Sequence, residues 1–202
     1  MKKAILIAAS TAAMAFVAPQ AFAQAKNFEG FSAVLSANSA STNTNMKFIA
    51  GGDYSGSGPG TYASVQAQYA FALTDKVVLG VGATAALNSY SLGSIFTTIN
   101  LEGTQKQQMS VDLMPGYAVS ETALVFGRVS YIDSKSSSAG VLGTTEKDTS
   151  GIGYGLGLRM MANKNLFWQV EYGSNVYNDV TTAFATTKMT SSVLSLGVGY
   201  KF

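Results

Sequence analysis

The 202-residue sequence contains no cysteine and no histidine. Without cysteine, the chain can form neither disulfide bonds nor Cys-ligated metal sites. Without histidine, it lacks the side chain most often used as a general acid or base near neutral pH. Charged residues are also scarce, at 12% of the chain compared with about 25% in typical soluble domains. We therefore predict no catalytic residue, no cofactor and no metal site.

Long apolar runs are also missing, so no membrane-spanning helix is expected. The apolar run 4–18 is short, follows Lys2 and Lys3, and precedes a small-x-small cleavage pattern at 21–23. Residues 1–23 are therefore predicted to be a cleaved signal peptide, and residues 24–202 a single exported domain. Without the two lysines, 11 basic residues remain against 11 acidic ones. A formally neutral chain gives no basis for nucleic-acid binding.

The sequence does contain regular alternation of apolar residues with small or polar ones, which is the period of a β-strand. In the segment 62–73, Val65 and Tyr69 share one face, while Gln66 and Gln68 share the other. Eight such segments are found: 28–37, 62–73, 77–87, 108–119, 125–131, 152–160, 166–173 and 195–202.

Short and long connections alternate between these segments. The short ones contain three residues each, centred on Asp75, Glu121 and Asn163, and predict tight hairpins. Symmetric pairing about these centres predicts three cross-strand pairs: Tyr69 with Val81, Val119 with Ala123, and Met160 with Leu166. The long connections are polar and are predicted to be loops: 38–60, 89–106, 133–150 and 175–189. Pro115 lacks a backbone donor and predicts a local bulge.

The two faces of the strands differ in a way that separates a membrane barrel from a soluble one. A soluble ligand-binding barrel directs its apolar face inward and has a charged exterior. Here the second face consists of Gly, Ser, Thr, Gln and Ala with isolated charges, which suits a narrow interior better than a soluble surface. Aromatic residues lie at two levels, as expected of two membrane interfaces. The two groups are Phe31, Tyr69, Phe71, Tyr117, Trp168, Tyr200 and Phe202 near the short turns, and Tyr131, Tyr154 and Tyr172 near the long connections.

The chain ends in a strand with an aromatic last residue. Ser195, Gly197, Tyr200 and Phe202 place a polar residue, a glycine and two aromatics at fixed distances from the terminus. This pattern resembles the C-terminal insertion signal of bacterial outer-membrane β-barrels. The resemblance implies recognition by the barrel-assembly machinery.

The mature chain as a whole resembles the small eight-stranded outer-membrane proteins, a group that includes the transmembrane domain of outer membrane protein A and the opacity-type surface proteins. The similarity extends to strand count, the alternation of short and long connections, and the LMPGY stretch at 113–117. It implies an all-β fold, an eight-stranded antiparallel up-and-down transmembrane β-barrel in the outer membrane of a Gram-negative cell. It also implies a monomer surrounded by outer-membrane lipid and lipopolysaccharide, with short turns in the periplasm.

Some small outer-membrane barrels are lipid-modifying enzymes or proteases, whose chemistry relies on a histidine base. This chain has no histidine, so an enzyme of that kind is not expected. A Ser–Lys or carboxylate-only mechanism would need none, but no Ser/Lys pair stands out among the serine-rich segments. Glu146 and Asp148 flank Lys147 without the spacing of a calcium-binding loop.

Four charged residues are predicted to point into the lumen from successive strands: Asp112, Arg128, Arg159 and Glu171. Buried ions without partners are costly, so these side chains should pair. Symmetry about Glu121 places Asp112 opposite Ser130 and diagonal to Arg128, and predicts that this acid and this base meet. The network would either plug the barrel or line a conduction pathway.

The predicted barrel is compatible with two functions. The first is a structural or surface-interaction role, in which four long extracellular loops meet an extracellular ligand or host surface. The second is a narrow porin-like channel for ions or small solutes.

Overall fold

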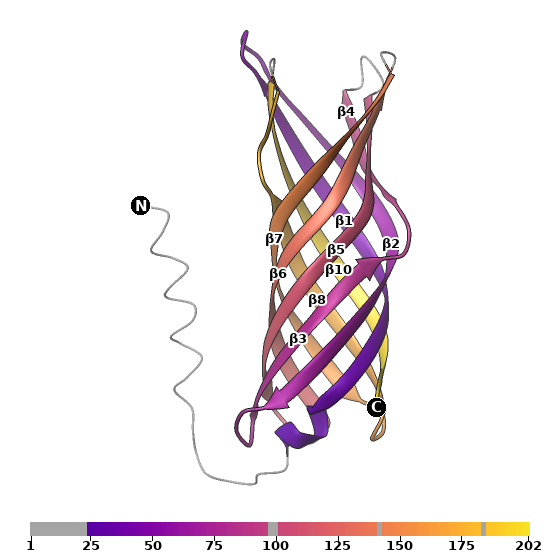
Figure 1. Ribbon diagram of the computed structural model, residues 1–202, viewed down its shortest axis with the longest axis vertical. Coiled ribbons are helices and arrows are strands. Elements are labelled where there is room, and N and C mark those ends of the chain that lie inside the picture. Colours follow the sequence, from indigo (N-terminus) through magenta and orange to yellow (C-terminus); the bar gives the residue numbers. More distant parts are fainter. Residues whose placement is uncertain (1–23, 97–100, 141–142, 183–184) are drawn as a thin grey trace, which may run out of the picture.

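The computed structural model describes residues 24–96, 101–140, 143–182 and 185–202 (Figure 1). The predicted signal peptide, residues 1–23, lies outside the described residues. A short 3-10 turn, η2 (Ala25–Phe28), precedes the strands. The strands are β1 (Gly30–Phe48), β2 (Asp53–Ala72), β3 (Val77–Ala86), β4 (Tyr90–Phe96), β5 (Leu101–Ala118), β6 (Ala123–Gly140), β7 (Gly143–Met161), β8 (Leu166–Tyr177), β9 (Val180–Thr181) and β10 (Ala185–Lys201). Across the described ranges, no helix is long and apolar enough to span a membrane.

The strands close into a barrel. Neighbours follow the order β1-β2-β3-β5-β6-β7-β8-β10, and β10 pairs with β1 along its length, from Ser32 opposite Lys201 to Phe48 opposite Ala185. Every pair is antiparallel. The ladders close the ring along the turn-end half, whereas the distal part of β2 has a ladder only with β1 among the described residues. The predicted eight-stranded antiparallel up-and-down barrel is confirmed.

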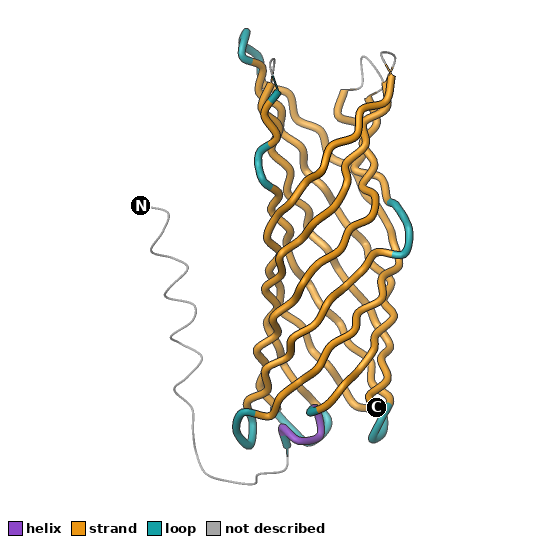
Figure 2. Tube along the Cα trace, in the orientation of Figure 1, coloured by secondary structure: helices purple, strands orange, loops and turns teal. Residues whose placement is uncertain are grey.

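Three tight turns lie at one end of the barrel, which we call the turn end (Figure 2). Each begins with the same backbone bond, for example Val119 N to Ala123 O at 2.9 Å. The predicted pairs of Tyr69 with Val81 and of Val119 with Ala123 are confirmed. The third prediction is wrong, because Met160 lies opposite Trp168 instead of Leu166. That turn is centred one residue later than predicted, and the resulting shift of two residues keeps the same side chains outward.

The opposite end, which we call the distal end, differs more strongly from the prediction. The four segments predicted to be loops are mostly strand, so that β1 continues to Phe48 and β2 begins at Asp53. Only residues 49–52 connect these two strands. Serine, threonine, asparagine and glycine suggested loops by composition, but two antiparallel neighbours provide backbone hydrogen bonds whatever the side chains are.

The predicted bulge at Pro115 is also wrong. Pairing of β5 with β3 and β6 keeps one register on both sides of Pro115. The register of β5 against β6 shifts instead between Lys106 and Met109, where Gln107 has φ 48°. An extra residue reverses the alternation of the strand beyond it. As a result Gln105 and Gln108 both point into the barrel.

The exterior of the turn-end half is apolar, as predicted. Large apolar side chains from all of its strands are exposed there, and both groups of aromatic residues lie among them. Toward the distal end the outward residues become polar, for example Ser39, Ser41 and Asn43 on β1 and Ser57 and Thr61 on β2. The same strands thus carry a lipid-compatible band and a polar extension.

Candidate functional site in the barrel interior

The interior is filled in successive layers, beginning at the turn end. Here η2 forms a lid, in which Ala25 and Phe28 are buried against Ala70, Val78, Ala118 and Leu124. Ala25 N donates to Asp75 O at 2.9 Å, Asn27 Nδ2 donates to Glu121 O at 3.0 Å, and Lys201 Nζ donates to Asn27 O at 2.8 Å. The lid therefore joins two turns and the last strand. Sequence reasoning placed residue 28 in the first strand and missed this layer.

The second layer is built around Arg159. Its guanidinium carbon lies 4.3 Å from the ring centre of Phe167 and 5.8 Å from that of Phe126, a cation–π arrangement. Arg159 Nη2 donates to Gln169 Oε1 at 2.8 Å. The neighbouring inward positions are glycines, and they must be: a Cβ on Gly157 would lie 2.3 Å from Phe126 Cζ. Large rings on one strand thus occupy the space left by glycine on the next.

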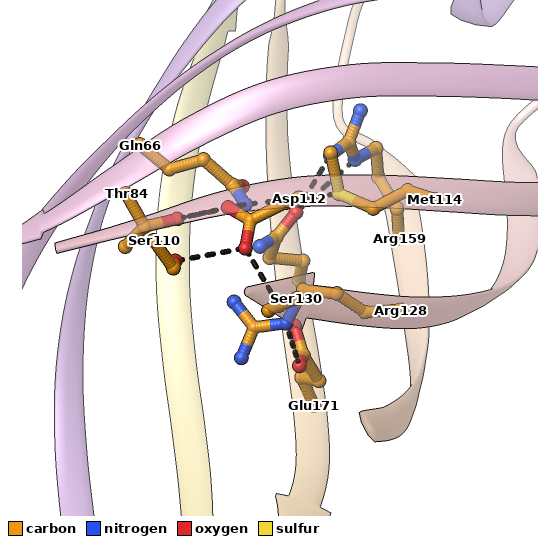
Figure 3. Close-up of polar contacts among 10 residues, drawn as sticks. Gln66, Thr84, Ser110, Asp112, Met114, Arg128, Ser130, Arg159 and Glu171 are labelled. Carbon is orange, nitrogen blue, oxygen red and sulfur yellow. Dashed lines mark hydrogen bonds and ion pairs between the residues drawn. The ribbon is translucent and has the colours of Figure 1, made fainter. Parts of the chain in front are cut away.

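Asp112 forms the third layer (Figure 3). Its carboxylate accepts hydrogen bonds from three hydroxyls: Ser110 Oγ at 2.8 Å, Ser130 Oγ at 2.7 Å and Thr84 Oγ1 at 2.5 Å. Gln66 Nε2 lies 3.4 Å from Asp112 Oδ2, the oxygen that Thr84 also contacts. Hydrogen bonds to the charged form stabilise a buried carboxylate without a cation beside it. Asp112 is buried, and these donors satisfy both of its carboxylate oxygens.

Arg128 pairs with Glu171, and Arg128 Nε lies 2.7 Å from Glu171 Oε1. The predicted pairing of Arg128 with Asp112 is therefore wrong. Arg128 stands opposite Gly155 on β7, and a Cβ on Gly155 would come 3.0 Å from Glu171 Oε1. Because glycine leaves this position empty, the arginine reaches across β7 to Glu171 on β8. Asp112 already has its hydroxyl donors.

A small polar cavity lies on the distal side of this ion pair. Its volume is about 30 Å³, which holds about two water molecules. Its lining is mainly hydroxyl and amide side chains, including Ser36, Asn38, Ser64, Gln66, Gln108, Ser110, Gln169, Asn175 and Ser195, with Arg128 and Glu171 at one side.

The next layer toward the distal end is aromatic, and a buried polar group of Gln105, Ser134 and Thr149 lies beyond it. The rings of Tyr62 and Tyr90 stack at 4.5 Å, and the hydroxyls of Tyr90 and Tyr177 both donate to Gln108 Oε1, at 2.7 and 3.2 Å. Burial raises the pKa of Tyr90, which keeps its hydroxyl a donor. Tyr90 also belongs to an apolar cluster with Ala40, Leu92, Ile132, Tyr177, Met189 and Val193.

The C-terminal residues take structural positions. Tyr200 and Phe202 are exposed in the turn-end aromatic group, and the Phe202 ring lies 5.5 Å from that of Phe31. Ser195 lines the cavity, and a Cβ on Gly197 would lie 2.5 Å from Ser36 Oγ. Glycine is thus required at 197 by the crowded interior, independently of any recognition.

Among the residues that the structure describes, no three His, Cys, Asp or Glu side chains group as metal ligands. Asp112 and Glu171, the two buried carboxylates, are bound by hydroxyls and by arginine respectively.

A closed ring of eight antiparallel strands with an apolar band outside and a filled interior defines a small membrane-embedded β-barrel. The family described as outer membrane protein beta-barrel domain matches residues 8–202. The chain belongs to this family. No curated protein matches it.

Several solved structures are similar to this chain. Neisserial surface protein A has a TM-score of 0.53 at 14% identity, covering 83% of this chain and 97% of its own. Ail, the attachment invasion locus protein of Yersinia pestis, has a TM-score of 0.49 at 16% identity, covering 86% and 99%. OprG of Pseudomonas aeruginosa has a TM-score of 0.47 at 15% identity, covering 86% and 97%. At 14% identity, the similarity to Neisserial surface protein A shows the fold alone.

Proposed function

We propose that this protein is a non-conducting, non-enzymatic outer-membrane barrel that acts through the surface of its distal half. The filled interior is the observation that carries the proposal. Side chains occupy the lumen at the lid, at Arg159, at Asp112 and at the tyrosine layer, and the cavity among them has room for about two waters. A continuous aqueous path would need each layer to move.

The distal half supports the second part of the proposal. It raises a polar β-extension above the apolar band, where a partner could reach it. Both signs of charge are interspersed there, and three exposed pairs neutralise part of it: Lys47 with Asp53, Lys106 with Glu146, and Lys188 with Asp179. Such a surface offers hydroxyls and amides to an extracellular ligand or host surface, without a field of one sign to attract polyelectrolytes.

The remaining parts of the proposal concern export and orientation. Residues 1–23 act as the signal peptide, the barrel-assembly machinery reads the C-terminal residues, and the turn end faces the periplasm. The barrel is a monomer in contact with outer-membrane lipid and lipopolysaccharide. An epitope inserted at Gly51 should then be labelled on intact cells, and one at Glu121 should not. Labelling of the Glu121 epitope on intact cells would reverse the orientation.

Single-channel recording of the refolded protein tests the closed lumen. We expect a nearly silent parent. The Arg159→Ala variant should remain silent, because the lid and the tyrosine layer still close both ends. A parent that already conducts, with ion selectivity altered by Arg128→Ala, would instead establish the narrow channel.

A further inference from the structure

The strand β4 is joined to the barrel differently from the others. It continues the path of β3 after residues 87–89, and within the described residues its only ladder is with β5. That ladder contains two register shifts, between Ser91 and Gly93 and between Ser94 and Phe96. The ladder of β2 with β3 ends where Ser64 lies opposite Ala86. Beyond this point the ladder between neighbouring wall strands is interrupted.

Two glycines of β2 show where β4 lies. Gly58 and Gly60 share the inward parity of Ser64 and Gln66, which are buried in the lumen. A Cβ on Gly58 would lie 2.2 Å from Gly93 Cα, and one on Gly60 would lie 2.5 Å from Ser91 O. The backbone of β4 therefore packs against the inner face of β2.

β4 does not line the polar cavity itself but supports its distal side through Tyr90, which contacts two of the lining residues. Tyr90 and Leu92 are buried in the distal apolar cluster, and Tyr90 bonds Gln108, which itself lines the cavity. Tyr62, which stacks on Tyr90, also lines it. Toward the turn end the cavity is closed by the η2 lid and by the Arg159 layer, which is held by the unbroken ladders of β7 with β6 and β8. The side held by the fewest backbone bonds is the distal one.

We propose that the cavity is a blind pocket that opens to the distal end when β4 moves, and that it accepts a small uncharged hydrogen-bonding solute. The lining chemistry selects this class. Hydroxyl and amide groups can exchange hydrogen bonds with such a solute, whereas Arg128 and Glu171 already neutralise each other and Asp112 is already bound by hydroxyls. An ion entering the pocket would lose its hydration without gaining an unpaired countercharge, because the two charged residues of the lining are paired with each other and Asp112 does not line the cavity. This pocket is independent of the proposed surface function. A negative result in the tests below would leave the surface function unaffected.

Because the chain has no native cysteine, a single cysteine introduced into the pocket can be labelled selectively. A single cysteine at Ser64, a buried lining residue, is treated with methyl methanethiosulfonate in the refolded protein, where both barrel ends meet solvent. The labelling rate of a gated site follows its open fraction. We expect slow labelling of S64C and a rate about tenfold higher or more in S64C/Y90A. Gly58→Ala should also accelerate labelling, because its new Cβ pushes β4 off β2 while Tyr90 is kept.

Matched variants locate the entrance. Ser57→Ala, adjacent to Gly58 but facing outward, should leave the rate unchanged. Phe126→Ala, which loosens the turn-end layer, should have no more effect than Ser57→Ala. Equal rates in S64C and S64C/Y90A, or a faster rate with Phe126→Ala than with Tyr90→Ala, would overturn the proposal.

Two further measurements test the solute class and the moving strand. Formamide, which has three non-hydrogen atoms, should slow labelling of S64C/Y90A by competition, and a trimethylammonium methanethiosulfonate should react more slowly than the neutral reagent. In the unaltered protein, amides 90–92 should exchange hydrogen faster than amides 79–83 of β3. Faster reaction of the cationic reagent would overturn the solute class, and equal exchange of the two strands would overturn the gate.

Discussion

The turn-end half and the distal half of this barrel are built from the same strands but are stabilised differently. In the turn-end half, alternation is strict, the exterior is apolar, and the interior is packed with rings, paired charges and a lid. In the distal half the exterior is polar, β5 contains a bulge, and β4 lies inside the wall. Side-chain alternation thus selects which segment meets lipid, whereas backbone pairing alone is enough to continue the strands beyond it.

The largest expected effect tests the packed interior of the turn-end half. Arg128→Ala should reduce the free energy of unfolding by about 3 to 5 kcal/mol, because it leaves the buried Glu171 uncompensated. Glu171→Ala should cost less, because Arg128 is only partly buried. The double variant should lose less than the sum. Urea unfolding followed by the fluorescence of Trp168, the single tryptophan, measures each value. Strict additivity would show that the two side chains do not interact in solution.

A smaller loss is expected from the lid. Phe28→Ala removes a buried ring from the turn-end cluster, and the burial of such a side chain is worth about 1.5 to 3 kcal/mol. The same change at Phe31, whose ring is exposed on the exterior, should cost less in detergent. Equal losses at both positions would mean that the lid is not seated in the refolded protein.

The glycine that faces a ring should be sensitive to a single methyl group. Gly157→Ala would place its Cβ 2.3 Å from Phe126 Cζ, and such overpacking costs about 1 to 3 kcal/mol. Gly127→Ala is the matched control, since its nearest neighbours would lie 3.9 Å away. Both variants add one methyl group to a strand glycine, but Gly157 faces the lumen and Gly127 faces the exterior. Similar stability of both would contradict the tight packing of Phe126.

The smallest effect concerns pH and the distal half. The hydrogen bond from Lys106 Nζ, at 2.7 Å, holds the pKa of Glu146 below its ordinary value. A carboxyl with a lowered folded pKa stabilises the fold above its unfolded pKa of about 4.3, and this contribution is lost as pH falls through the folded value. Amide exchange near residues 106 and 146 should therefore accelerate modestly at acid pH, and Lys106→Met should remove the pH dependence. The exchange in β3 should not respond to Lys106→Met.

The inward positions of the charged residues could be predicted from the sequence, but their interaction partners could not. Alternation placed Asp112, Arg128, Arg159 and Glu171 on inward positions, because parity is a local property of a strand. It could not assign their partners, since Arg128 reaches Glu171 only across the empty position of Gly155 on an intervening strand. The alternation also contained a signal that could have predicted the apolar layers of the lumen. The apolar residues Leu124, Phe126 and Phe167 lie at inward positions.

The amino-acid sequence by itself determined the barrel class, the eight lipid-facing segments, two of the three turn registers and the direction of the apolar face. All of these follow from a period of two residues and from short turns, which depend on near neighbours in the chain. Only the tertiary structure decided that the polar segments continue as strands, that Gln107 reverses the alternation of β5, and that η2 and β4 close the two ends. Those features depend on which backbones lie side by side and where a glycine leaves room, and residues far apart in the sequence settle both.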